Sequence, residues 1–301
     1  MRRTALLLLA LVPAGAGAQS FTRADTARLH RTLDSLAAAH RGVVGYAVRN
    51  VDTGEQLELR GDSTFPTASL IKVSVLVTLY DLVAKGEISL DDRITVLRID
   101  KVPGSGLLQH LHDGLEITVG DAAWLMTTIS DNTATNLILD KVAIRRVWQK
   151  MEALGLPRSR IHSKTFLRMT SVAMDSSVKY GLGVTTPNEM SRLFELLATG
   201  KAVSPAADST MLRILENNGY NQMLQRYADG IVIAHKDGEG DQIRTECALF
   251  RLQSRVVACV LTKDNADRRW LIDNEAQVAM AKMGLAIISA WPRPQQAGNR
   301  E

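Results

Sequence analysis

Beyond its N-terminus, the chain has no apolar run near the length of about 20 residues that a membrane-spanning helix needs. It also lacks repeats, low-complexity tracts and an obvious linker. Its 36 basic and 32 acidic residues give a formal net charge of +4, too small and too evenly spread to indicate a nucleic-acid-binding protein. Its six histidines are scattered, apart from His110 and His112 around one leucine, so we expect no zinc and no other metal or cofactor. What remains is an ordinary globular protein of one or two domains in 301 residues.

Residues 1–18 have the three parts of a secretory signal peptide. The basic start MRR is followed by the apolar stretch TALLLLALVPAG and by the small residues Ala16-Gly17-Ala18. The alternatives are a buried N-terminal helix or an anchor, but the apolar stretch is too short to span a bilayer. We expect cleavage near Ala18, a periplasmic or secreted protein, and a mature charge nearer 4 − 2 = +2 once Arg2 and Arg3 are removed.

The two cysteines, Cys247 and Cys259, flank a segment that reads as a β-hairpin turning near Gln253-Ser254. With a two-residue turn, Cys247 faces Val260, and the cysteines lie on opposite faces because side chains alternate along a strand. A three-residue turn reverses that result. Disulfides persist outside the cytoplasm, but on the shorter turn we favour two buried free thiols.

Strand-like runs stand at both ends of the chain, and a mostly helical stretch, about 69–227, stands between them. An amphipathic helix is predicted over 21–40 and a long one over about 270–290. Two strands are predicted around the turn at 52–54, and three more in GIVIAHK, RTECALFRL and RVVACVLTK. This order predicts an α+β fold, a five-stranded antiparallel sheet flanked by helices (three layers, α/β/α) with an all-helical subdomain. We place one catalytic domain at 19–301, its sheet part at about 19–65 and 228–301 and its helical subdomain at about 66–227, with the site in the crevice between them.

A lysine stands where the pattern least favours one. From Ser69 to Val83 the sequence is almost entirely apolar, as in a buried helix, yet it contains Lys72. A buried lysine is costly unless it is partnered or neutral. Residues three apart share a helix face, so a desolvated Lys72 amine could act as the base that activates the Ser69 hydroxyl. Pro66 fits a sharp entry that exposes Ser69 at the helix start, and the alternative is a lysine that reaches out of a helix end.

Two later motifs could complete such a site. Ser130-Asp131-Asn132 lies between two apolar helical runs, where Ser130 could relay a proton and Asn132 could position a lysine and bind an amide. The alternative is a simple helix cap. Lys236, followed by Asp237-Gly238, ends an apolar strand along whose edge a substrate could lie as an extra strand. The alternative there is an ordinary lysine before a turn.

In their order and spacing, these three motifs resemble those of the serine β-lactamase and penicillin-binding protein family, most closely the class A β-lactamases. The resemblance spans nearly all of the mature chain. It implies that Ser69 is the nucleophile, Lys72 the buried amine that helps Ser69 to acylate, Ser130 the proton relay, and Asn132 the lysine partner and amide anchor.

The same resemblance implies a role for the strand motif. Lys236 would anchor a substrate carboxylate, beside Gly238, and the backbone N–H groups of Ser69 and Glu239 would form the oxyanion hole. Arg244 would add positive charge for the same carboxylate. The implied partner is a small β-lactam or peptidoglycan-like molecule, and we expect a monomer.

Two features depart from the family pattern. Class A enzymes carry a glutamate in a loop before a TTP helix start, and it activates the deacylating water. Between Arg160 and Pro187 this chain has no glutamate; Asp175 is the only carboxylate, and Thr165 or a neighbour stands about where the base would be. Asp237 replaces the usual Thr or Ser, and it would repel a substrate carboxylate or pair with Arg244 or Lys236.

Three functions follow from these features. The leading prediction is an exported serine hydrolase, a β-lactamase that forms an acyl-enzyme and deacylates slowly. The second is a penicillin-binding-type D-Ala-D-Ala peptidase or an esterase on the same scaffold. The third is a non-catalytic binding module that keeps the fold.

Overall fold

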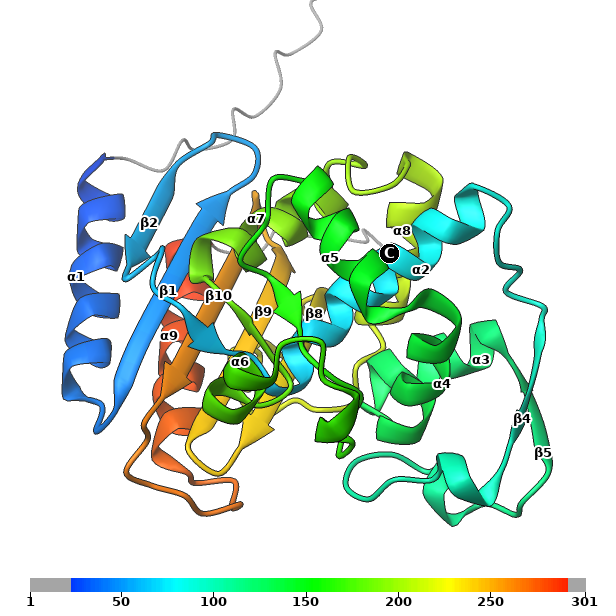
Figure 1. Ribbon diagram of the computed structural model, residues 1–301. Helices are drawn as coiled ribbons and strands as arrows, with labels where there is room; N and C mark the ends of the chain where they lie inside the picture. Colours follow the sequence, from blue (N-terminus) through cyan, green and yellow to red (C-terminus); the bar gives the residue numbers. More distant parts are fainter. Residues whose placement is uncertain (1–22, 292–301) are drawn as a thin grey trace, which may run out of the picture.

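The computed structural model describes residues 23–291, and these are arranged around a five-stranded antiparallel sheet in the order β2-β1-β10-β9-β8 (Figure 1). Two strands come from the start of the chain and three from its end, as the sequence predicts. The fold class is confirmed. The strands are β1 (Val43–Asn50), β2 (Gln56–Leu59), β8 (Ile233–Gly240), β9 (Ile243–Arg251) and β10 (Arg255–Lys263).

Helices cover both faces of the sheet. On one face α1 (Arg23–Ala39) and α9 (Glu275–Ala290) pack side by side, drawn in blue and red in Figure 1. Successive side chains of β10 point to opposite faces of the sheet. Val256, Ala258 and Val260 belong to the apolar cluster beneath α1 and α9. Val257 and Leu261 belong to the cluster on the helical side. This alternation is the period of two expected of a strand buried on both faces.

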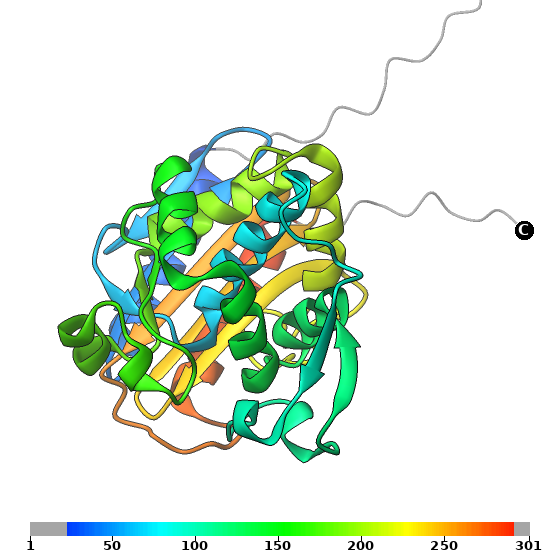
Figure 2. The ribbon, with the colours of Figure 1, turned by 45° about the vertical axis from the view of Figure 1, so that its right-hand side comes forward.

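The second face carries the helical part, and its centre is α2 (Lys72–Ala84), which is buried at every position from Lys72 to Tyr80. In Figure 2, α2 (cyan) runs in front of the yellow and orange strands of the sheet. The remaining helices are α3 (Val119–Thr128), α4 (Asn132–Val142), α5 (Ile144–Ala153), α6 (Met174–Tyr180), α7 (Pro187–Ala198) and α8 (Pro205–Leu215).

Short elements connect these helices. They are two small sheets, one of β3 (Phe65–Pro66), β7 (Gly183–Thr185) and β6 (Arg160–Ile161), the other of β4 (Arg93–Val96) and β5 (Leu115–Thr118), and the 3₁₀ helices η1 (Ala68–Ile71), η2 (Arg98–Asp100), η3 (Leu108–His110) and η4 (Arg168–Thr170). One apolar cluster runs from α2 through α7 to β9 and β10, so the helical part and the sheet share a core. The proposed division near residues 66 and 227 stays a prediction.

One predicted boundary shifts by a few residues. The last helix begins at Glu275 rather than near 270, because the Asn274 side chain accepts hydrogen bonds from the backbone N–H groups of Ala276 and Gln277 and caps it there. The predicted signal peptide lies outside the described residues. Within residues 23–291, no helix combines the length and apolar character needed to span a membrane.

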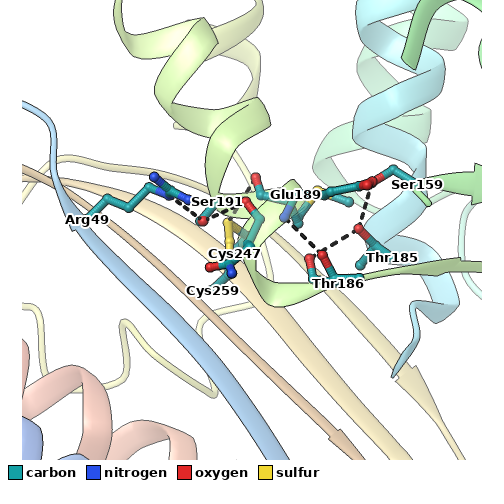
Figure 3. The surroundings of a disulfide bond; sticks show 10 residues. Arg49, Ser159, Thr185, Thr186, Glu189, Ser191, Cys247 and Cys259 are labelled. Carbon is teal, nitrogen blue, oxygen red and sulfur yellow. Dashed lines mark hydrogen bonds between the residues drawn. A yellow bond between two sulfur atoms is a disulfide. The ribbon is translucent and has the colours of Figure 1, made fainter. Parts of the chain in front are cut away.

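The prediction of two free thiols is wrong. Arg251 pairs with Arg255 across the β9–β10 hairpin, so three residues form the turn, and Cys247 stands directly opposite Cys259. The two cysteines form a disulfide, with their Cα atoms 4.0 Å apart (Figure 3). One additional turn residue moves one strand by one position against the other, and that shift brings both sulfur atoms to the same face.

Candidate active site

Ser69 lies in η1, a single 3₁₀ turn that leads directly into α2. The turn follows Pro66, and Ala68 adopts φ +47°, a left-handed conformation that is strained for a residue with a side chain. Ser69 is half-buried and borders a cavity of about 880 Å³. The sharp entry into the helix therefore presents the Ser69 side chain at an open site, as the sequence indicates.

The end of β8 approaches η1 closely, and Gly238 permits that approach. A Cβ atom at position 238 would lie 2.2 Å from the Thr67 carbonyl oxygen and 2.7 Å from the Leu70 nitrogen, both of them backbone atoms. Thr245 on β9 holds the contact by donating from its hydroxyl to the Thr67 carbonyl at 2.8 Å. Glu239, the next residue, borders the cavity together with Ser69.

Lys72 is buried at the start of α2, and its amine donates three hydrogen bonds, none of them to Ser69. The acceptors are the Ser130 carbonyl (2.7 Å), the Ser130 hydroxyl (3.2 Å) and Asn132 Oδ1 (2.9 Å). Burial, followed by the positive charge of Lys236, holds the pKa of Lys72 well below its usual range. All three acceptors are uncharged oxygens, so no carboxylate bonded directly to the amine offsets the effect of burial.

The loop between α3 and α4 divides its two predicted roles among different residues. Asp131 caps α4 by accepting from the Ala134 N–H at 2.9 Å, and it also accepts from the backbone of Leu107 and Leu108. Ser130, at φ +55°, and Asn132 are thereby left to face Lys72 and the cavity. The capping interpretation and the functional interpretation of this motif are therefore compatible.

On β8, Lys236 and Asp237 form a buried ion pair, with 2.8 Å between Nζ and Oδ1. Asn218 donates to the same oxygen at 3.1 Å. Burial alone would raise the pKa of Asp237, but the charge of Lys236 and the hydrogen bonds from Lys236 and Asn218 outweigh it and keep that pKa below its usual value. Of the two partners considered for Asp237, the structure selects Lys236.

Arg244 does not reach Asp237. Its Nε lies 3.4 Å from a carboxylate oxygen of Glu239, and its other nitrogens donate to the carbonyls of Gly240, Ile243 and Arg269. Its guanidinium carbon lies 4.8 Å from the centre of the Trp270 ring. Arg244 is fully buried, whereas Trp270 is exposed and borders the cavity.

Thr165 borders the cavity on the segment between Arg160 and Pro187, which contains no glutamate. The Asn136 side chain clamps its backbone, accepting from the Thr165 N–H at 2.8 Å and donating to the Thr165 carbonyl at 3.1 Å. The Thr165 hydroxyl donates to Asn136 Oδ1 (2.8 Å) and to the Asn132 carbonyl (3.0 Å). Asp175 lies exposed in α6 and does not border the cavity.

The sequence model of the β-lactamase enzyme family matches residues 28–291. The chain belongs to this family. It is 24% identical over 250 residues to a β-lactamase of Rhodobacter capsulatus, covering 81% of this chain and 83% of that protein. The prediction of an enzyme of the β-lactamase family is confirmed.

Two solved structures are also similar. A β-lactamase of Sphaerobacter thermophilus superposes with a TM-score of 0.76 at 29% identity, over 89% of this chain and 97% of that one. A leucine-to-glutamate mutant of PBP-A, in its acyl-enzyme complex with penicillin G, has a TM-score of 0.76 at 25% identity, over 88% and 96% of the two chains.

Three residues of this β-lactamase-family site lie outside the three sequence motifs, so the motifs do not predict them. Asn218 and Tyr220 come from the segment after α8, and Trp270 comes from the loop before α9. Tyr220 and Trp270 border the cavity, and Asn218 holds Asp237. Only the Asn217-Asn218-Gly219 triplet, typical of a turn, marks any of these positions in the sequence.

Proposed function

We propose that the protein is an exported serine hydrolase that forms an acyl-enzyme with β-lactams through Ser69 and deacylates it slowly. The observation that carries this proposal is the buried Lys72 amine, held between Ser130 and Asn132 with a lowered pKa. A neutral amine can accept a proton, whereas an ordinary surface lysine is charged at neutral pH.

In the acylation step, the Ser69 oxygen attacks the lactam carbonyl carbon, and its proton passes to the Lys72 amine. Backbone N–H groups of Ser69 and Glu239 stabilise the resulting oxyanion. The C–N bond then breaks, and the leaving nitrogen takes a proton through the Ser130 hydroxyl, which lies 3.2 Å from Lys72 Nζ. The product is a serine ester, which one water molecule must hydrolyse to release the acid and restore Ser69.

That hydrolysis is the step we propose to be slow. The single hydrogen of the Thr165 hydroxyl is shared between two neighbouring oxygen atoms, and a hydroxyl is not a base at neutral pH. The two carboxylates that border the cavity, Asp237 and Glu239, both belong to β8 rather than to the segment around Thr165. The PBP-A structure, in which an acyl-enzyme with penicillin G is observed, is a precedent for this intermediate in a protein similar to this chain.

The direct test is labelling with a fluorescent penicillin, followed by mass spectrometry. We expect the wild-type chain to gain one adduct on Ser69 that persists for many minutes, and Ser69→Ala to gain none while remaining folded. Ser74→Ala is a matched control, because Ser74 is a buried serine on α2 that does not border the cavity. An adduct on Ser69→Ala, or no adduct on the wild type, would contradict the proposal.

An esterase on the same scaffold is the second candidate. The Lys236–Asp237 ion pair favours it, since that pair neutralises the charge that would anchor the β-lactam carboxylate. Hydrolysis of a chromogenic cephalosporin, compared with that of a D-Ala-D-Ala peptide and a neutral ester, separates these activities. A chain that reacts with none of them, and takes no penicillin label, would be a binding module.

Export and oligomeric state belong to the same proposal. The basic, apolar and small-residue segments of residues 1–18 support cleavage near Ala18. N-terminal sequencing of the protein recovered from the periplasm or the medium tests the cleavage site. Light scattering tests the expected monomer.

A further inference from the structure

Both basic side chains of the β8–β9 edge are covered from the cavity. Lys236 is fully buried and ion-paired with Asp237; Arg244 is fully buried, pairs with Glu239 and lies under the Trp270 ring. The groups that border the cavity at this edge are the two carboxylates, the apolar side chain of Ile243 and the Trp270 indole. A negatively charged group placed here would meet acidic side chains before it met either cation.

Each carboxylate keeps one oxygen atom out of these pairs. Asp237 uses Oδ1 for both Lys236 and Asn218, and Glu239 uses Oε2 for Arg244. In the part of the chain that the structure describes, no hydrogen bond or ion pair to Asp237 Oδ2 or Glu239 Oε1 is found. Both residues border the cavity, so these oxygen atoms are available to a ligand with hydrogen-bond donors or a positive charge.

Two aromatic residues border the same cavity. Trp270 is 60% exposed, and both it and Tyr220 border the cavity. The Asn218 side chain links Tyr220 to this edge, because it accepts a hydrogen bond from the Tyr220 N–H at 3.0 Å and donates one to Asp237 Oδ1 at 3.1 Å. Carboxylates combined with the faces of aromatic rings are the surroundings in which proteins bind substituted ammonium groups.

We propose that Asp237, Glu239, Tyr220 and Trp270 form a subsite for an alkylammonium group on the leaving half of an ester or amide substrate. The inference rests on the proposed function of Ser69. In such a substrate, the alkylammonium group would take the position of the carboxylate that β-lactams carry near their leaving nitrogen, and it has the opposite charge. The two basic residues that border the cavity lie on another segment, around Thr165. There Lys164 pairs with Asp140, and Arg168 lies exposed on η4.

Three thioesters of matched shape test the subsite. Their common acyl group is transferred to Ser69, and the leaving thiol carries a trimethylammonium group, its neutral tert-butyl isostere or a carboxylate. A disulfide reagent detects the released thiol, and the chain has no free cysteine to interfere because Cys247 and Cys259 are joined. We expect kcat/KM for the cationic thioester to exceed that for the neutral isostere by about 3- to 30-fold, the range of a partly desolvated cation–π contact.

Variants show whether this wall causes the preference. Trp270→Leu removes the aromatic face without changing any charge and should lower the ratio of cationic to neutral turnover several-fold, whereas Trp270→Phe should keep most of it. Asp237→Asn removes a negative charge and leaves Lys236 without its ion-pair partner, so it should also lower the ratio. Ile272→Ala is the matched control, since Ile272 is exposed on the same loop and does not border the cavity.

Calorimetric titration with the 2-hydroxyethyltrimethylammonium ion, compared with neutral 3,3-dimethylbutanol, tests the subsite without catalysis. Preferred binding of the cation, weakened in Trp270→Leu, supports the inference even if no thioester reacts. Equal binding of the two compounds, or a preference for the carboxylate thioester, overturns it. A penicillin adduct on Ser69 beside such a result would leave the proposed function intact, whereas cation binding without any adduct would overturn only the function.

Discussion

The site contains two buried lysines in opposite surroundings. Lys72, on the helical side, is held by three uncharged oxygens from Ser130 and Asn132. Lys236, on the sheet side, is held by the Asp237 carboxylate and the Asp237 carbonyl. Burial drives an amine that has no carboxylate bonded to it toward its neutral form, whereas the carboxylate of an ion pair offsets that effect and cancels the charge of the amine. This difference supports our proposal that Lys72 transfers the proton, and it leads us to propose that Lys236 and Asp237 select the substrate.

The largest expected effect comes from removing the helical-side amine. Lys72→Ala should slow acylation of Ser69 by penicillin about 10²- to 10⁴-fold, because a general base contributes rate factors of that size. Stopped-flow fluorescence with a labelled penicillin measures this rate. Lys85→Ala is the control, since Lys85 follows the same helix but is exposed and pairs with Asp81. Equal rates in wild type and Lys72→Ala would make Lys72 a structural residue.

The next effect concerns deacylation. Thr165→Glu places a carboxylate on the wall that lacks one, while the backbone of residue 165 stays clamped by Asn136. We expect hydrolysis of the penicillin acyl-enzyme to become about 10²-fold faster, the lower end of general-base contributions. Loss of the adduct over time, followed by mass spectrometry, measures it. Thr165→Gln has nearly the same shape but no base, and should not accelerate the step.

A smaller effect should follow from breaking the ion pair on the sheet side. Asp237→Thr frees Lys236 and restores a hydroxyl donor, so anionic penicillins should acylate Ser69 about 5- to 150-fold more efficiently, equivalent to about 1–3 kcal/mol. Neutral esters, which lack the carboxylate, should gain little. Steady-state comparison of a penicillin with a neutral ester measures this difference. Unchanged penicillin acylation would show that the pair does not limit anion binding.

The two sides of the site also differ in how far the sequence predicts them. Ser69 and Lys72 lie three residues apart on one helical segment, so their proximity follows from local geometry. The sequence leaves two possible partners for Asp237. The Asn218 side chain, which binds Asp237 beside Lys236, comes from 19 residues earlier in the chain, in a loop without periodicity. Trp270 and Tyr220 come from similar loops.

The cysteine pair shows how sensitive such predictions are. The sequence predicts both strands of the hairpin, but the prediction of free thiols rests on a turn of two residues, and the structure has the three-residue alternative. Because side chains alternate with a period of two, an error of one residue moved a cysteine to the wrong face. Strand positions follow from composition, whereas register depends on a turn length that composition does not determine.

The smallest expected effect connects the two lysines. Burial is the main cause of the low pKa of Lys72 and the charge of Lys236 is the second, whereas Asp131 and Asp237 act in the opposite direction. Lys236→Met therefore raises the pKa of Lys72 toward its ordinary value. Acylation needs the neutral amine, so the acidic limb of its pH–rate profile should move to higher pH.

Two choices keep that measurement specific to Lys72. A neutral ester substrate removes any effect of Lys236 on carboxylate binding, and the double variant Lys236→Met/Asp237→Asn avoids an unpaired buried carboxylate. The acidic limb should still move to higher pH in the double variant, because the charge of Lys236 affects the pKa of Lys72 more than the charge of Asp237 does. Lys164→Met, which removes a cation paired with Asp140 on the opposite wall, is the control.

Stability gives the same test without any substrate. Between the lowered pKa of Lys72 and its ordinary value of 10.5, the unfolded chain binds more protons at this residue than the folded chain does. The contribution of Lys72 to the free energy of unfolding is therefore fully present at a pH above its ordinary pKa. This contribution is lost as the pH falls toward the lowered pKa of the folded state. Lys236→Met should raise the folded-state pKa of Lys72 and so narrow the pH range between the two pKa values. The free energy of unfolding should therefore begin to rise with pH at a higher pH than in the wild type. If neither the kinetic limb nor this onset moved, the two lysines would be electrostatically independent, and the low pKa of Lys72 would have to arise from burial alone.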